Sequence, residues 1–301
     1  MKPSLHGVIV VDKPAGPSSF GVVKTVRRLL QVKKIGHLGT LDPFAVGVLP
    51  LCLNEATKLT PFLLEQPKTY RATVFLGAQT DTQDSTGTLT ASNAPLPSAE
   101  VIARTLATFV GEQWQTPPLF SALHFQGRRL YQYARQGIAV EVPPRKITIM
   151  DLTLESLQLP EVTFRVTCSK GAYIRTLAAD LGRELGCGAY LQALQRLRVG
   201  PFTLDQAMSL PARPDEQTPE KLWEHLIPLA DCLPHLPTLQ MGATEAAQVR
   251  QGRSLPLAGE DLGAKPGEHL KVVWQQTLVA VAVLVDDLQG TRLQPVRGFN
   301  S

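Results

Sequence analysis

The residue with the clearest chemical potential is Asp42, a carboxylate that follows a long stretch without other acids. Residues 14–41 contain no Asp or Glu, and their five bases are Lys24, Arg27, Arg28, Lys33 and Lys34. Nearby cations keep a carboxylate ionised, so Asp42 could act as a nucleophile or stabilise positive charge. A loop aspartate before a proline is also a common turn residue or helix cap, and the residues alone leave both interpretations open.

Four further side chains could assist such a carboxylate. His37 lies five residues before Asp42 and suits a proton shuttle or a contact to phosphate or base, although it could equally be a plain hydrogen-bonding residue. Tyr70 and Tyr173 lie on or beside predicted strands, where an aromatic ring either packs in the core or meets a ligand. Arg175 could grip an ionised aspartate through two hydrogen bonds, or it could be a surface charge.

The sequence lacks the signatures of cofactor and metal chemistry. It has no phosphate-binding or dinucleotide-binding glycine motif, no HExxH and no GxSxG. Its four cysteines form no CxxC pair and no zinc-ligand spacing with histidine. The acidic stretch 81–84 does not follow the ligand pattern of an EF-hand calcium loop. We therefore expect no metal and no cofactor, and chemistry carried by ordinary side chains in a reduced, cytoplasmic protein.

Short predicted elements position the first of these residues. Residues 8–11 predict a strand, and the helix that follows has Ser18 or Ser19 as its N-cap. Apolar residues at helical spacing predict its buried side, whereas the first three bases named above share another side. Residues 36–43 (GHLGTLDP) predict a loop, because two glycines and a proline interrupt any period.

The middle of the chain predicts two strands and two helices. Residues 68–77 and 162–168 alternate apolar and polar side chains, as half-buried strands do. Leucines at 177, 181 and 185 predict a helix that ends at Gly186. Residues 191–198 (LQALQRLR) predict a second, basic helix.

Two other segments predict loops. Residues 77–87 form a polar loop after the first of these strands. A segment from about 116 to 146 has Pro-Pro pairs near both ends and carries Arg128, Arg129 and Arg135 beside two tyrosines. We interpret this segment as a bounded, basic insert that carries several aromatic residues.

The composition is that of a soluble globular protein. The chain has 301 residues and a mass of 32.8 kDa, with 44% hydrophobic residues, which allows one large domain or a main domain with a smaller one. The longest apolar run, 278–285, has strand length, and we expect neither a membrane span nor a signal peptide. The net charge of +4 indicates an anionic partner only where the bases cluster.

The character of the sequence changes near Leu236. Beyond this residue, short predicted strands alternate with turns rich in glycine and proline. We therefore expect a catalytic domain over residues 1–235 and a small β-rich domain over residues 236–301.

Five ordered motifs resemble those of the bacterial TruB family of tRNA pseudouridine synthases. They are residues 7–16 (GVIVVDKPAG), 36–43 followed by 47–50 (GVLP), 68–87, 117–135 and 169–182 (SKGAYIRTLAADLG). The resemblance implies an α+β fold: a catalytic domain with a mixed, mostly antiparallel sheet and an inserted basic loop, and then a small C-terminal PUA-like RNA-binding domain.

The resemblance also implies catalytic roles. Asp42 corresponds to the catalytic aspartate of the family, Tyr173 to its active-site tyrosine and Arg175 to the arginine that pairs with the carboxylate. Arg175 would then keep Asp42 deprotonated, and Tyr173 would move a proton to or from the nucleotide.

Substrate-binding residues follow from the same motifs. His37 corresponds to the histidine that helps receive the flipped nucleotide, Tyr70 to the aromatic that stacks on the base, and Leu194 to an apolar wall of the base pocket. Lys13 matches the first motif, where its part is mainly structural. The bases of the acid-free stretch, with Arg128, Arg129 and Arg135, would neutralise RNA phosphates.

The chain departs from the family pattern in its insert. Phe120 and His124 stand where the family usually has tyrosine and lysine. A histidine carries no permanent positive charge, so the phosphate contact expected at His124 is weakened at neutral pH.

The expected activity is isomerisation of the T-loop uridine usually numbered 55 in tRNA to pseudouridine. The reaction needs no redox change and no energy input, and the aspartate either attacks C1′ or assists elimination across the sugar. We expect a monomer that acts on tRNA without guide RNA, membrane or obligate protein partner. The alternatives are an RNA-guided synthase of the H/ACA type, which the long insert and the lack of charge-rich tails disfavour, and an RNA-binding or RNA-folding factor with minor catalysis.

Overall fold

A large mixed sheet organises the first three quarters of the chain in the computed structural model, which describes residues 6–121, 123–211, 215–257, 263–288 and 290–300. Most of its neighbouring strands are antiparallel. In spatial order the main path is β14 (Met208–Ser209), β1 (Gly7–Lys13), β3 (Val46–Leu53), β12 (Ala189–Val199), β4 (Lys68–Leu76), β11 (Glu161–Cys168), β10 (Arg145–Gln158) and β7 (Gly111–Gln115). Three short strands pair at its margins: β2 (Ile35–His37) with β3, β13 (Phe202–Thr203) with β12, and β15 (Ile227–Pro228) with β1.

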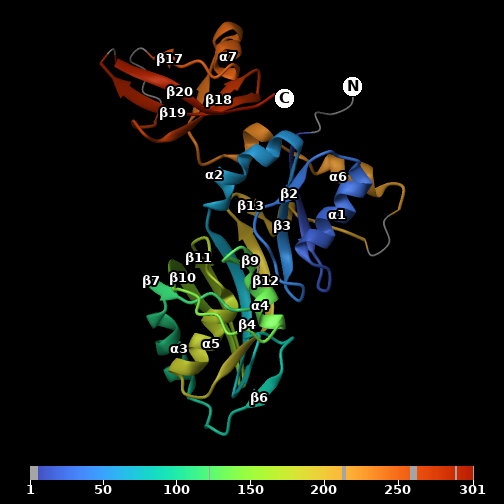
Figure 1. Cartoon of the computed structure of the whole chain (residues 1–301), viewed down its shortest axis with the longest axis vertical. Helices are drawn as coiled ribbons and strands as arrows, with labels where there is room; N and C mark the ends of the chain where they lie inside the picture. Colours follow the sequence, from blue (N-terminus) through green and yellow to red (C-terminus); the bar gives the residue numbers. More distant parts are fainter. Residues whose placement is uncertain (1–5, 122, 212–214, 258–262, 289, 301) are drawn as a thin grey trace.

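Helices bury the apolar sides of this sheet in two separate clusters. Over β1 and β3, the valines of α1 (Ser19–Leu30) pack with Ile9 and Leu51. Over β4, β11 and β12, the helices α3 (Ala99–Thr108) and α5 (Ile174–Glu184) close a second core (Figure 1). The remaining helices of this part are η1 (Asn54–Leu59), α2 (Thr60–Leu64), α4 (Leu130–Arg135), η2 (Leu204–Gln206), α6 (Thr218–Glu224) and η3 (Leu229–Cys232).

The insert and the loop after β4 each contain a small hairpin. The hairpins pair β5 (Ala78–Thr80) with β6 (Leu89–Ala91), and β8 (His124–Phe125) with β9 (Arg128–Arg129). The second hairpin runs directly into α4, and β8, β9 and α4 lie within the predicted insert (Figure 1).

The end of the chain forms a second sheet with its own core. Its five strands are, in spatial order, β16 (Thr238–Gln240), β18 (His269–Trp274), β19 (Thr277–Asp287), β20 (Gly290–Gly298) and β17 (Leu255–Pro256). The helix α7 (Ala243–Arg250) packs on it through Ala246 and Val249. This module, residues 238–300, also contacts the main body, because Val281 and Phe299 join the buried cluster of Val8 and Leu59.

Most of the predicted elements are present. The strands expected at 8–11, 68–77 and 162–168 are β1, β4 and β11, and the predicted helix over the three leucines is α5. Gly186 follows α5 with φ 72°, a left-handed conformation that glycine adopts without strain. The short strands expected in the tail are also present.

The prediction of a helix at residues 191–198 is wrong, because this segment lies in the central strand β12. Its buried residues are Ala189, Leu191, Leu194, Arg196 and Val199, at spacings of two and three. The register with β4 shifts at two places along the strand, and each irregularity lengthens the alternation by one residue. Two bulges thus give a strand the apolar spacing of a helix.

Two predicted loops contain short strands. Gly36 and His37 belong to β2, where they pair with Cys52 and Leu51 of β3, so the loop proper begins at Leu38. Residues 78–80 form β5, which pairs with the chain just beyond the predicted loop. Neither segment shows apolar alternation because each strand is short and lies at a margin.

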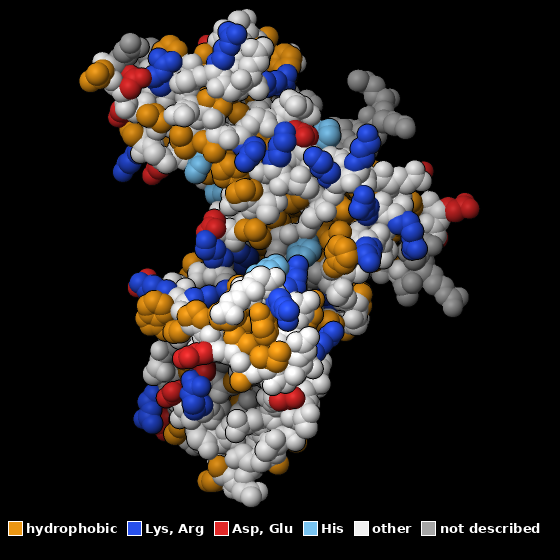
Figure 2. Space-filling model, in the orientation of Figure 1, with side chains coloured by type: hydrophobic (Ala, Val, Ile, Leu, Met, Phe, Trp, Pro, Cys, Tyr) orange, Lys and Arg blue, Asp and Glu red, His pale blue; other side chains and the backbone are white. Residues whose placement is uncertain are grey.

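Basic side chains gather on the visible face of the molecule over α1 and its surroundings (Figure 2). Lys24, Arg27 and Arg28 of α1 and Lys33 and Lys34 beyond it are all exposed. Among the residues that the structure describes, no helix has the length and apolar character required to cross a membrane.

Candidate active site

Asp42 lies on a loop, residues 38–45, that connects β2 to β3 and is fixed along its whole length. Ser19, the first residue of α1, holds its middle: the backbone N–H of Leu41 donates to Ser19 Oγ at 2.8 Å, and Ser19 Oγ donates to the Leu41 carbonyl at 2.9 Å. The neighbouring Ser18 is the N-cap of α1 and accepts from the N–H of Gly21. Ser18 therefore caps the helix, and Ser19 holds the loop.

Lys13 holds the second half of the same loop. Its side chain is buried, with 0% exposure, and Nζ donates to the carbonyls of Pro43 at 3.1 Å and Ala45 at 2.7 Å. Burial lowers the pKa of Lys13 from 10.5 to about 8, against the attraction of Asp42. This ammonium is an internal clamp rather than part of the exposed basic surface.

The carboxylate of Asp42 forms an ion pair with Arg175 in the first turn of α5. Arg175 Nε lies 2.9 Å from Asp42 Oδ2, and the Nη2 group donates to Oδ1 at 3.3 Å. The arginine is 3% exposed, whereas the aspartate side chain is 32% exposed. One side of the carboxylate is therefore neutralised from within the protein, and the other is open to a substrate.

Arg175 also binds a second carboxylate, that of Asp84. Its Nη1 lies 3.4 Å from Asp84 Oδ2 and donates to the Thr82 carbonyl at 3.2 Å, while Nη2 donates to the Phe120 carbonyl at 2.9 Å. Asp84 is buried, and its Oδ1 accepts hydrogen bonds from Thr82 and Thr86. The loop after β4 and the insert are thereby tied to the guanidinium that holds Asp42.

Burial and the charges around Asp42, including that of Lys13, act on its protonation. Burial raises the pKa of its carboxyl above the ordinary 3.8, the Arg175 guanidinium works in the opposite direction, and Asp84 adds to the rise. A carboxylate with a raised pKa is a better nucleophile and base than one in water. The ion pair with Arg175 meanwhile favours its ionised form.

An apolar floor lies beside the loop. Tyr70 of β4 and Leu194 of β12 belong to one buried cluster with Leu41, the neighbour of Asp42. Tyr70 is 9% exposed and lies opposite the buried Arg196 in the pairing of β4 with β12. Burial raises the pKa of Tyr70. The structure thus brings the predicted aromatic, the predicted apolar wall and the predicted aspartate together.

His37 lies at the end of β2, directly before the loop. Burial and the positive charge of Arg196 lower the pKa of its imidazole. A histidine with a lowered pKa is neutral at neutral pH, so His37 offers a hydrogen-bonding group rather than a cation to a ligand.

Tyr173 is the N-cap residue of α5, two positions before Arg175. Its backbone is fixed by Gln115 of β7, which accepts from the Tyr173 N–H at 2.7 Å and donates to its carbonyl at 3.0 Å. The Arg145 guanidinium lies 4.8 Å from the centre of the Tyr173 ring. The ring is therefore held at the start of the helix that supplies Arg175.

The predicted RNA-binding bases lie outside this centre, on the surface. Arg128 and Arg135 of the insert line an open hollow of about 620 Å³ with Tyr131, Gln132 and Gln136. Arg129 and His124 are exposed in the same insert. These side chains and the basic face of α1 are accessible to a polyanion.

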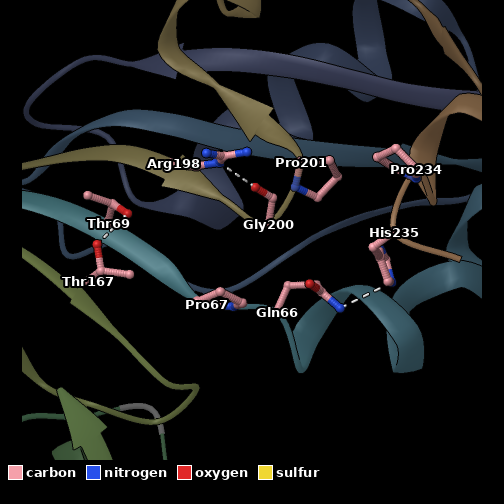
Figure 3. Close-up of a pocket in the computed structure, with 9 residues that line it drawn as sticks. All are labelled: Gln66, Pro67, Thr69, Thr167, Arg198, Gly200, Pro201, Pro234 and His235. Atoms are coloured by element: carbon pink, nitrogen blue, oxygen red, sulfur yellow. Dashed lines mark hydrogen bonds between the residues drawn. The ribbon is translucent and has the colours of Figure 1, made fainter. Parts of the chain in front are cut away.

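A second hollow, of about 450 Å³, lies where β4, β11 and β12 approach the segment that leads to the terminal module (Figure 3). Thr69 and Thr167 face each other across neighbouring strands there, and Gln66 is hydrogen-bonded to His235. None of the predicted site residues lines this hollow.

Three residues of the candidate site escaped the sequence reasoning. Ser19 is part of a Ser-Ser pair in which only one residue can cap the helix, and Asp84 lies in the acidic stretch considered for calcium. Arg196 lies in the segment predicted as a basic helix, but it is 1% exposed and donates to three carbonyls around the loop. Of the three, only Ser19 could have been suspected from the sequence, because it is the serine that is not needed as the helix cap.

Comparison with known proteins places this chain among the pseudouridylate synthases. The family profile described as the N-terminal domain of TruB family pseudouridylate synthase matches residues 27–174, and the tRNA pseudouridylate synthase B C-terminal domain matches residues 175–233. The chain therefore belongs to the TruB family. The resemblance found in its sequence motifs is confirmed.

Relatives and solved structures agree with this membership. The chain is 44% identical over 293 residues to tRNA pseudouridine synthase B of Geobacter sulfurreducens, covering 95% of both proteins. It is 47% identical over 248 residues to the protein of the same name from Syntrophus aciditrophicus, covering 82% of this chain and 80% of that one. A chain of an archaeal box H/ACA ribonucleoprotein structure is similar at 25% identity with a TM-score of 0.73, covering 98% of this chain and 86% of that one.

Proposed function

We propose that this protein isomerises the uridine usually numbered 55 in the T loop of tRNA to pseudouridine, with Asp42 as the reacting carboxylate. The ion pair of Asp42 with the buried Arg175, on a loop clamped by Lys13 and Ser19, carries the proposal. The names of relatives that align over at least 80% of both chains support tRNA as the substrate class.

The proposed reaction breaks the N1–C1′ bond of uridine and joins C1′ to C5. Asp42 either attacks C1′ directly or assists elimination across the sugar, and in both routes C5 loses a proton while N1 gains one. The reaction involves no oxidation or reduction, and substrate and product contain the same atoms. Tyr173 is the proposed proton carrier, because it lies at the start of the helix that supplies Arg175.

The target base is stacked within folded RNA and must leave the stack to reach Asp42. Tyr70 and Leu194 are the proposed platform and wall for the flipped base, because both lie in one apolar cluster beside the loop. Stacking on an aromatic ring offsets roughly 1–3 kcal/mol of the lost base stacking. The neutral imidazole of His37 is the proposed contact at the edge of this site.

The RNA backbone has three proposed contact surfaces. They are the basic face of α1, the insert with Arg128, Arg129 and Arg135, and the β-rich terminal module, which we interpret as PUA-like. We take residues 1–235 as the catalytic domain and residues 236–301 as the RNA-binding domain. The protein would work as a monomer in the cytoplasm, without guide RNA.

A tritium-release assay tests the proposal. Purified protein is mixed with a T-stem-loop transcript labelled at C5 of uridine, without metal or guide RNA. We expect release from the target uridine by the natural protein and none by Asp42→Asn. The variant should still bind the RNA, because the amide leaves the exposed basic surfaces unchanged.

Three results would contradict parts of this proposal. Full activity of Asp42→Asn would exclude Asp42 as the reacting group. Release that requires an added guide RNA would favour the RNA-guided alternative. Tight tRNA binding without any release would favour an RNA-folding factor.

A further inference from the structure

Arg196 of β12 is a buried cation without a carboxylate partner in the described part of the chain. The residue is 1% exposed, and its three side-chain nitrogens donate hydrogen bonds to backbone carbonyls. Burial of a guanidinium is costly unless hydrogen bonds replace its hydration. The buried guanidinium of Arg196 therefore needs an explanation other than filling space in the core.

The carbonyls that Arg196 binds lie at the two ends of the loop that carries Asp42. Its Nη2 donates to the Gly39 carbonyl at 3.1 Å and Nη1 to the Thr40 carbonyl at 3.4 Å, at the start of the loop. Its Nε donates to the Val48 carbonyl at 2.8 Å, just after the loop has become β3. One side chain therefore ties the entrance of the loop to its exit.

Glycine allows β3 to approach Arg196 so closely. Gly47 has φ 103° and lies beside Arg196 in the parallel pairing of β3 with β12, where a Cβ would meet the Arg196 carbonyl oxygen at 2.3 Å. Any side chain at position 47 would separate β3 from β12. The close pairing and the guanidinium contacts depend on each other.

The same guanidinium reaches the aromatic floor. Tyr70 lies opposite Arg196 in the antiparallel pairing of β4 with β12, so the two side chains are neighbours on one side of the sheet. Both residues are buried, and the positive charge of Arg196 acts on the Tyr70 hydroxyl. Arg196 is thus hydrogen-bonded to the loop of Asp42 and lies beside the proposed base platform. The other two clamps, Lys13 and Ser19, hold the loop from β1 and α1 through hydrogen bonds to its backbone.

We propose that Arg196 is a positioning residue that fixes the catalytic loop relative to the Tyr70 platform. The ribose faces Asp42 while the base lies on Tyr70, and the base must turn without either contact drifting. Through Arg196 the two surfaces form one rigid unit. This inference rests on the proposed function. It deepens that function by naming the residue that keeps the Asp42 loop and the Tyr70 platform in fixed positions.

The rival interpretation is that Arg196 only stabilises the fold. In that case its substitution lowers the folded fraction, and the protein that stays folded turns over at the natural rate. A positioning role predicts a different result, because a displacement of about 1 Å in a reacting group can lower a rate about a hundredfold without weakening binding.

The test uses the full chain with the variants Arg196→Lys and Tyr70→Phe and the control Arg198→Lys. Lysine keeps the charge at position 196 but cannot reach all the carbonyls, and phenylalanine removes only the hydroxyl. Arg198 is exposed on the same strand, with Nε donating to the Gly200 carbonyl. Single-turnover tritium release gives the rate at saturating RNA and the half-saturating RNA concentration, and thermal unfolding gives the folded fraction.

We expect Arg196→Lys to lower the saturated rate by about ten- to a hundredfold, with the half-saturating concentration changed by less than about threefold. Tyr70→Phe should lower the rate in the same way, and the double variant should lose less than the product of the two single losses. Arg198→Lys should keep the natural rate.

Three outcomes would overturn the inference alone while the natural protein stays active. They are an unchanged saturated rate in Arg196→Lys, a loss that matches the unfolded fraction, and a loss carried by the half-saturating concentration. Multiplicative losses in the double variant would also overturn the link to Tyr70. If the natural protein released no tritium, the proposed function would fail, and this inference with it.

Discussion

Arg175 and Asp42 form an ion pair across 133 positions of sequence, with Nε 2.9 Å from Oδ2. The arginine is supplied by the first turn of α5 and the aspartate by a loop between two strands. Because Arg175 is buried and Asp42 is partly open, the protein fixes the charge from one side and leaves the other side for chemistry.

The activity should fall on the acid side at a pH above the ordinary carboxyl range. Burial raises the folded-state pKa of Asp42 above 3.8, so protonation removes the reactive carboxylate as the pH falls through that raised value. Single-turnover rates measured between about pH 4 and about pH 8 would show this fall, which is the acid limb of the pH profile. Circular dichroism is the control for folding. A rate that stays constant down to the pKa of an ordinary aspartate would contradict the raised pKa.

Asp84→Asn should move this acid limb to lower pH. Asp84 raises the pKa of Asp42 and shares its arginine, so an uncharged amide leaves Arg175 to Asp42 alone. The substitution also weakens buried hydrogen bonds, and we expect a stability loss of about 1–3 kcal/mol. The matched control is Asp81→Asn, an exposed residue of the same loop. A limb that stays in place in Asp84→Asn would show that the two carboxylates are not coupled.

Parts of this site could be predicted because chemistry and local sequence coincide there. Asp42 stands out as the one acid after a basic stretch, and the strands β1, β4 and β11 show clear alternation. Residue chemistry offers Arg175 as a possible partner of Asp42 but equally as a surface charge, and only the family resemblance favours the pairing, since nothing local joins two residues so far apart in sequence. Local patterns predict elements, and pairing between elements requires the fold.

Arg196 shows why the remainder could not be predicted. An arginine in a leucine-rich basic segment is normally an exposed charge. The two irregularities in β12 conceal the alternation that would have placed it on the buried side. Its partners are backbone carbonyls, which every residue possesses, so no side-chain type elsewhere in the sequence announces them.

The two serines at the start of α1 should separate stability from catalysis. Ser18→Ala removes the helix cap and should cost about 1 kcal/mol of unfolding free energy while the turnover rate is kept. Ser19→Ala removes both hydrogen bonds to Leu41, beside Asp42, and should lower the saturated rate by about tenfold or more. Chemical denaturation and single-turnover assays on both variants measure the difference. Equal rates in the two variants would exclude Ser19 as a support of the loop.

Lys13→Met should destabilise the protein by about 1–3 kcal/mol at neutral pH, because the Pro43 and Ala45 carbonyls lose their donor. The difference should widen with pH. The folded-state pKa of Lys13 is about 8 against 10.5 unfolded, so between these values the unfolded chain binds more protons and the natural protein gains stability that the variant cannot. Denaturation at several alkaline pH values tests this, with exposed Lys33→Met as control. A constant difference would refute the lowered pKa.

Removing charge from α1 should weaken RNA binding in a salt-dependent way. The bases Lys24, Arg27 and Arg28 are exposed on one helix, so each is free to displace a counterion from a phosphate. Replacing all three with glutamine should lower the slope of log affinity against log salt by about 2 to 3 while leaving the rate at saturating RNA unchanged. The control replaces Lys146 and Arg165, exposed bases of β10 and β11, with glutamine. An equal change of slope in the control would mean that general charge, and not the α1 surface, binds the RNA.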